Sequence, residues 1–179
     1  MTKKALLLIL FAPTFLIGFS VGAAAPEEGK IPTLSTILGK GDPRKALVRD
    51  CAGLVDRQVA AKSGLSGFVI KGAYGVIKTV REGFVPGVID TLLTDWLKEL
   101  EPFYQDWQKT KQTTFSAYLT GRSGEVSEAL LKVTDRRIKK SRHATVRGAY
   151  DKLRNSAKEN VTAAVPELGK ILEAHLPKP

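Results

Sequence analysis

The fold class is decided by residues 62–104, which read KSGLSGFVIKGAYGVIKTVREGFVPGVIDTLLTDWLKELEPFY. This stretch predicts two helices separated by a corner at Gly83. The first helix is expected to run from Ser66, as its cap, to Glu82, because its apolar residues recur at helical spacing and form one broad apolar face. Those residues are Val69, Ile70, Ala73, Tyr74, Val76, Ile77 and Val80.

The second helix of this stretch has the pattern of a core helix. Pro86 falls in its first turn, where a proline costs no hydrogen bond. Pro102 is expected to kink this helix or to start a new one, and the aromatic residues that follow it, Tyr104 among them, are expected to lie in the core. The apolar residues recur in pairs once per turn: Val88, Ile89, Leu92, Leu93, Trp96, Leu97 and Leu100.

Further helices are predicted on both sides. Asp42 and Pro43 mark the start of a helix that runs to about Lys62. Beyond residue 104 we expect a short helix at 114–120, a longer helix capped by Ser123, and a last helix from about Thr145 that Pro166 kinks or restarts. No segment alternates as a strand does. The sequence therefore predicts an all-α, single-domain bundle of five or six helices over residues 42–179.

Residues 1–24 have the layout of a secretory signal peptide. Lys3 and Lys4 precede an uncharged apolar block that ends in small residues at 22–25. The alternative is an uncleaved membrane anchor, since the block is near the short end of the spanning range. Residues 25–41 are expected to form a tether, in which Leu34, Ile37 and Leu38 make one turn that packs on the bundle. The protein is therefore expected to be exported to a periplasmic, cell-surface or extracellular location, or to be membrane-anchored.

The inventory of reactive residues does not favour an enzyme. Cys51 is the only cysteine, which excludes an internal disulfide, and its place in an apolar stripe predicts a buried thiol. His143 falls in a basic loop and His175 near a frayed terminus, so neither is expected to be oriented as a base. No metalloprotease, phosphate-loop, dinucleotide or calcium motif is present. We predict no catalytic residue, metal or cofactor.

Charge is distributed unevenly along a chain whose formal net charge is +10. Residues 84–107 contain five acids against Lys98, a net charge of −4, whereas residues 132–158 contain ten bases against two acids, a net charge of +8. The second segment is expected to bind an anionic membrane surface or envelope polymer rather than nucleic acid, because no nucleic-acid motif is present. The alternative is that part of it complements a helix C-terminus. The candidate binding residues are Arg136, Arg137, Lys139, Lys140, Arg142 and Arg147.

Gly72 and Gly75 lie inside a predicted helix, where each costs about 1 kcal/mol relative to alanine. We expect another segment or a ligand to approach the backbone closely there, and with Tyr104 these residues are candidates for an apolar pocket. Two functions follow. The protein is either an exported helical module that binds an anionic envelope component, or a carrier of a small molecule or lipid between its helices. A continuous cavity would favour the carrier. A monomer is expected.

Several short motifs resemble those of a known family. They are KSGLSG at 62–67, GFV at 83–85, PFY at 102–104, AYL at 117–119, LL and VTD at 130–135, and AY, KLR and SAK at 149–158. Together they are similar to a small all-helical bacterial family of unknown function, of actinobacterial type, from about Leu34 onward. The resemblance implies the same helical fold. It implies no activity, cofactor or catalytic residue, and the export segment departs from the family pattern.

Overall fold

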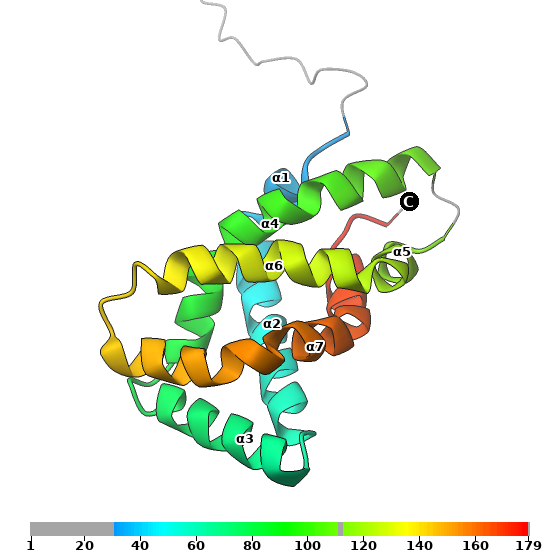
Figure 1. Cartoon of the computed structure of the whole chain (residues 1–179). Helices are drawn as coiled ribbons and strands as arrows, with labels where there is room; N and C mark the ends of the chain where they lie inside the picture. The colour runs from blue at the N-terminus through cyan, green and yellow to red at the C-terminus, as the bar shows by residue number, and fades with distance from the viewer. Residues whose placement is uncertain (1–30, 111–112, 179) are drawn as a thin grey trace, which may run out of the picture. The chain divides into compact units, whose positions relative to one another are not determined.

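The computed structural model describes residues 31–110 and 113–178. Within these ranges the chain forms seven α-helices and no strand, so the predicted all-α class is confirmed. Residues Ile31–Pro179 make one compact unit (Figure 1). The expected signal peptide and the first part of the expected tether lie outside the described residues. The helices are α1 (Leu34–Leu38), α2 (Gly41–Ala60), α3 (Gly64–Lys78), α4 (Phe84–Thr110), α5 (Phe115–Gly121), α6 (Ser123–Ile138) and α7 (Ala144–Ala174).

Helix α1 belongs to the bundle rather than to a tether. The Thr33 hydroxyl caps it by accepting a hydrogen bond from the backbone N–H of Thr36, and Leu34 and Leu38 are fully buried. The backbone N–H of Leu34 also donates to Glu101 Oε2 at 2.7 Å. The predicted packing turn is therefore confirmed, while the predicted end of the tether at residue 41 is wrong. Composition alone predicted the wrong boundary. The polar residues around α1 indicated a tether, whereas the burial of its two leucines attaches α1 to the bundle.

Helix α4 contacts more of the other described helices than any other does, packing against α1, α2, α3, α5 and α6. It continues through Pro102, so the expected new start there is wrong. Helix α7 likewise continues through Pro166. A proline removes one backbone hydrogen bond, but buried side chains on both sides of each proline hold the helix in place. These side chains are Leu100 and Tyr104 in α4 and Val165 and Leu172 in α7.

Helix α3 differs most from its prediction. It begins at Gly64, so Ser66 lies inside it and Ser63 is the N-cap, and it ends at Lys78 rather than Glu82. Ile70 and Ala73 are buried, but Val69 is 50 % exposed and Val76 is 45 % exposed. The expected single apolar face is therefore wrong, because apolar residues occur on two sides of this helix. The corner at Gly83 is confirmed, with a left-handed φ of 67° that favours glycine.

The core around α5 is densely filled. The Phe115 ring meets the ring of Tyr104 edge-on at a centroid distance of 5.5 Å and lies 5.2 Å from the ring of Trp107. Phe115 and Leu119 are fully buried. Tyr104 is 3 % exposed, which confirms its prediction as a core residue.

Among the described helices, none is both long enough and apolar enough to cross a bilayer.

Candidate functional site: an apolar cavity between five helices

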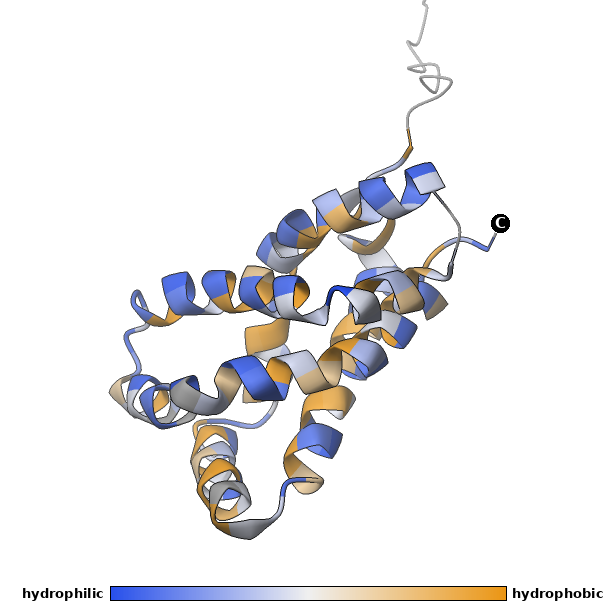
Figure 2. Ribbon diagram, turned by 45° about the vertical axis from the view of Figure 1, so that its right-hand side comes forward, coloured by the Kyte–Doolittle hydropathy of each residue, from blue (hydrophilic) through white to orange (hydrophobic). Residues whose placement is uncertain are grey.

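A cavity of about 440 Å³ lies between α2, α3, α4, α6 and α7. Ligand pockets in proteins typically measure about 300–1,000 Å³, so its size suits a small ligand. Figure 2 shows that the helices of the bundle carry both hydrophobic and hydrophilic segments. The apolar lining includes Cys51, Leu54, Val55, Val59, Ile70, Ile77, Phe84, Val85, Val88, Ile89, Leu92, Leu93, Leu97, Leu100, Leu130, Leu131, Ile138, Val146, Ala157, Val161, Ala164, Leu168 and Leu172.

The two tyrosines of the lining direct their hydroxyl groups to carboxylates. Tyr74 donates to Asp56 Oδ1 at 3.0 Å, and Tyr150 donates to Asp135 Oδ1 at 2.6 Å. Burial, followed by the neighbouring carboxylate, raises the pKa of both tyrosines, so both remain neutral donors at physiological pH. Their rings therefore border the cavity while their polar atoms are already used.

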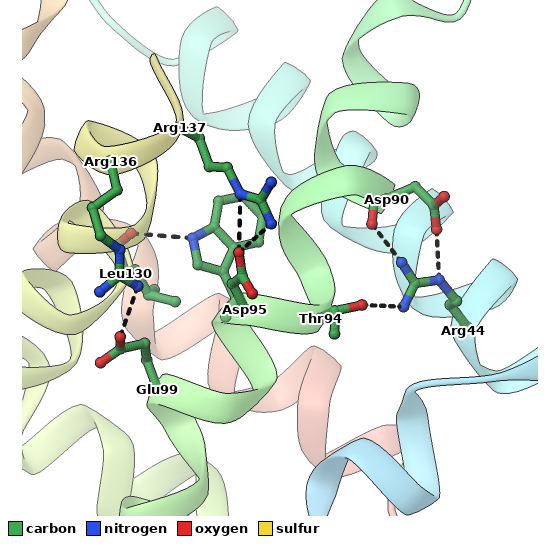
Figure 3. Close-up of polar contacts among 9 residues, drawn as sticks. Arg44, Asp90, Thr94, Asp95, Glu99, Leu130, Arg136 and Arg137 are labelled. Carbon is green, nitrogen blue, oxygen red and sulfur yellow. Dashed lines mark hydrogen bonds and ion pairs between the residues drawn. The ribbon is translucent and has the colours of Figure 1, made fainter. Parts of the chain in front are cut away.

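Other polar lining groups also bond to the protein. The Trp96 indole Nε1 donates to the Leu130 carbonyl at 3.1 Å, and Gln58 Nε2 donates to Glu167 Oε2 at 3.2 Å (Figure 3 shows the first bond). Thr134 Oγ1 donates to the same Leu130 carbonyl at 3.2 Å. With these polar atoms engaged, the wall offers a ligand carbon surface along most of its extent.

Lys62 is the charged residue of the lining within the described part of the chain. It follows the C-terminus of α2, it is half-buried, and no ion pair joins it to another described residue. Asn160, on α7, also borders the cavity. A cation beside an apolar cavity suits the anionic head of an amphiphile.

Cys51 lies in the same wall as a free, buried thiol. Burial, helped by the charge of Asp50, raises the pKa of the thiol to about 12. The thiolate is the nucleophilic form of cysteine, so Cys51 is unreactive at neutral pH. Its prediction as a buried apolar residue is confirmed.

The basic segment predicted to bind anions is partly neutralised by the acidic segment of α4. Arg136 Nη2 donates to Glu99 Oε1 at 2.9 Å, and Arg137 Nε donates to Asp95 Oδ2 at 2.9 Å (Figure 3). The two segments, of opposite charge, meet because α6 packs along α4. Arg136 and Arg137 therefore have structural partners.

The remaining bases of the predicted patch gather at the corner between α6 and α7. Arg147 Nη1 donates to the Ser141 carbonyl. Lys139, Lys140 and Arg142 have no ion pair with another described residue, and Lys139 is the C-cap of α6, where a cation also complements the helix dipole. We call Lys139, Lys140 and Arg142 the α6–α7 corner bases. Of the six predicted residues, Arg136 and Arg137 are thus paired with acids of α4, whereas Arg147 bonds to a neutral carbonyl and keeps its charge.

The glycines proposed for close approach do not serve that purpose. A Cβ atom added at Gly72 or Gly75 would meet nothing within 4 Å, and both residues are exposed on α3. Tyr104 accepts a hydrogen bond from Gln108 Nε2 at 2.7 Å and lies in the aromatic cluster, outside the cavity lining. An apolar pocket between helices is present, but none of these three residues lines it, so their prediction as pocket residues is wrong. The presence of glycines in a helix does not show which side of the helix faces the core.

The C-terminus of α7 is held rather than frayed. His175 is 18 % exposed, and its Nε2 lies 2.8 Å from Asp50 Oδ2 on α2, so the predicted frayed position is wrong. The hydrogen bond with His175 is the largest cause that lowers the pKa of Asp50. His143 packs edge-on against Phe84 at 6.1 Å between ring centroids. Neither histidine lines the cavity.

Sequence inspection missed the outer side of α3, where Leu65 is 90 % exposed and Phe68 is 80 % exposed. A signal was present in the sequence. The helix GLSGFVIKGAYGVIK carries apolar residues on two sides, whereas a surface helix needs only one apolar side for packing.

Comparison with known proteins identifies one related group. A family model described as a family of unknown function (DUF6918) matches residues 34–176, from the first residue of α1 to just beyond the end of α7. No curated protein and no solved structure matches the chain.

Proposed function

The chain belongs to this family of unknown function, and we propose that it binds and carries a single-chain amphiphile, with an apolar tail and an anionic head. The observation that carries the proposal is the cavity of about 440 Å³ with a carbon surface. A tail without polar groups matches such a wall, since a buried polar group without a partner is costly.

The size of the cavity favours an occupant. Its wall is almost entirely apolar and is not covered by other side chains. A ligand that fills the space would give this wall van der Waals contacts and remove its apolar surface from water.

We place the anionic head at Lys62. This lysine borders the cavity and has no ion pair with another described residue, so a carboxylate would bring it a partner. The tail would then extend between α3, α4 and α7. Under this proposal Lys62→Met weakens binding of dodecanoate but not of dodecanol.

The first test is a chain-length series. Octanoate, decanoate, dodecanoate and tetradecanoate would compete with a fluorescent fatty acid for the protein. Each buried methylene contributes about 0.8 kcal/mol, so two more carbons should raise the affinity about fifteenfold until the cavity is full. An affinity that does not change with tail length would contradict binding in the cavity.

A matched pair of variants locates the site. Ala164 lines the cavity and Ala163 beside it is exposed, both on α7. Ala164→Phe should fill part of the cavity and weaken dodecanoate binding at least tenfold, whereas Ala163→Phe should bind as the parent does. Circular dichroism would check that both variants fold. Equal affinity of the two variants would place the ligand elsewhere.

Association with an anionic envelope component is the second candidate. The α6–α7 corner bases favour it, because they have no ion pairs with described residues. We include in the proposal that the protein is exported, acts without catalysis and is a monomer. The two functions are compatible, since a carrier has to collect and release its ligand at a surface.

A further inference from the structure

Helix α3 carries an apolar stripe on its outer side. The stripe consists of Leu65, Phe68, Val69 and Val76, which are 90 %, 80 %, 50 % and 45 % exposed. Their positions fall on one side of a helix with a period of about 3.6 residues, together with Gly72. We call these four side chains the α3 outer stripe. Isolated exposed apolar residues are ordinary, but a contiguous stripe marks an interaction surface.

The opposite side of α3 faces the cavity. Ile70, Tyr74 and Ile77 belong to its lining, and Ile70 is buried. One helix therefore separates the cavity from the outer stripe. Figure 1 shows α3 at the edge of the bundle, and it packs only on α2, α4 and α7 among the described helices.

Few polar contacts attach α3 to the other described helices. Glycines with left-handed φ stand at its start, Gly64, and in the corner that follows it, Gly83. The side-chain hydrogen bonds that join α3 to other described helices both end on Asp56, from Tyr74 at 3.0 Å and Lys78 at 3.2 Å. Movement of α3 would open the cavity beside it while breaking few polar contacts.

The surroundings of the stripe are basic. Between residues 61 and 83 the chain has Lys62, Lys71, Lys78 and Arg81 against Glu82, and Lys78 is paired with Asp56 of α2. The α6–α7 corner bases lie near the same end, because His143 beside them packs on Phe84 at the start of α4. A second copy of the chain would bring the same positive charge to this face, whereas an anionic bilayer surface would complement it.

We propose that the α3 outer stripe docks the protein on a bilayer that contains anionic lipid. Leu65 and Phe68 enter the headgroup region, and the exposed Lys71 and Arg81 contact lipid phosphates. Docking places α3, which few polar contacts hold, between the cavity and the membrane, so an amphiphile can pass from one to the other. This passage rests on the proposed carrier function, but docking does not.

The test measures cosedimentation of the full chain with vesicles of phosphatidylcholine, with and without phosphatidylglycerol. The double variant Leu65→Ser/Phe68→Ser should bind the anionic vesicles at least tenfold less than the parent. The control Lys45→Gln/Lys109→Gln removes two exposed charges far from α3 in sequence and should bind less than threefold more weakly. All these proteins share residues 1–30, so any difference between them originates in the bundle.

Three results would overturn docking. The double variant could retain the partition of the parent, the parent could show no preference for anionic vesicles, or sedimentation equilibrium could show a parent dimer that the double variant dissociates. If the double variant does not fold, Phe68→Trp replaces it in the test. Brominated lipid should quench the fluorescence of the new tryptophan. An absence of quenching would contradict insertion. Dodecanoate affinity, measured in parallel, reports on the carrier function separately. Vesicle binding without dodecanoate binding would support docking and contradict the carrier function.

Discussion

The two ends of the helical bundle are built from the same long helices but packed differently. At the filled end, α1 and α5 cover the second half of α4, and Leu34, Leu38, Phe115 and Leu119 are fully buried. At the hollow end, α3 covers the cavity, and its own outer stripe remains exposed. Helix α7 contacts both α5 and α3, so it spans the two ends.

Side-chain volume accounts for the contrast. At the filled end three aromatic rings pack within 5.8 Å of one another, those of Tyr104, Trp107 and Phe115. At the hollow end α7 presents Ala157, Val161 and Ala164 to the space opposite α4, and these small residues leave it open. Dense packing stabilises a fold, whereas an unfilled apolar space can bind a ligand. We infer that the filled end supplies most of the stability and the hollow end the binding function.

The sharpest test of this division is Phe115→Ala. Removing a fully buried phenylalanine from a dense core should lower the free energy of unfolding by about 3–5 kcal/mol. Denaturation by urea, followed by circular dichroism, would measure the loss. A loss below about 1 kcal/mol would mean that the end named filled is not packed as described.

The matched change at the hollow end is Ile77→Ala. Ile77 already borders open space, so the truncation enlarges a cavity rather than creating one, and the cost should be about 1 kcal/mol without ligand. With saturating dodecanoate the cost should increase, because Ile77 then contacts the ligand. Urea denaturation of parent and variant, with and without dodecanoate, gives both numbers. An equal cost for Phe115→Ala and Ile77→Ala would remove the distinction between the ends.

The core helix that both ends share could largely be predicted from the sequence. The paired apolar residues of α4 between Ile89 and Leu100 predicted a core helix without tertiary information, as the burial of Ile89, Leu93 and Leu97 confirms. Cys51 was also placed correctly as a buried thiol. Periodicity reports which residues avoid water, and it succeeds wherever the apolar side of a helix is covered by its neighbours.

The hollow end could not be predicted in the same way. Periodicity cannot show whether the apolar sides of several helices meet or leave a gap, because this depends on how far apart the helices pack. Val69 and Val76 were therefore expected to be buried with Ile70, although they lie on the outer side of α3. The ion pairs of Arg136 and Arg137 were missed for the same reason, since their partners are on α4, far away in sequence.

The smallest predicted effect on stability concerns the polar contact between α2 and the end of α7. His175 Nε2 lies 2.8 Å from Asp50 Oδ2, and this bond lowers the pKa of Asp50. A carboxyl whose pKa is lower in the folded state stabilises the fold above its unfolded pKa of about 3.9, and this contribution disappears as the pH falls through the folded pKa. Asp50 is 36 % exposed, so the contribution should be below about 1 kcal/mol.

Asp50→Asn isolates this contribution. Above about pH 5 the variant should be slightly less stable than the parent, and the difference should decrease as the pH is lowered toward about 2, because the parent then loses the same charge. Urea denaturation of both proteins across this range would measure it. Asp56→Asn is the matched change at the hollow end. It removes the charge that holds Tyr74 and Lys78 and should therefore loosen α3. The loosening would be seen as more dodecanoate bound at short mixing times. A difference between Asp50→Asn and the parent that grows toward acid would contradict the lowered pKa and, with it, the ordered contact that closes α7 on α2.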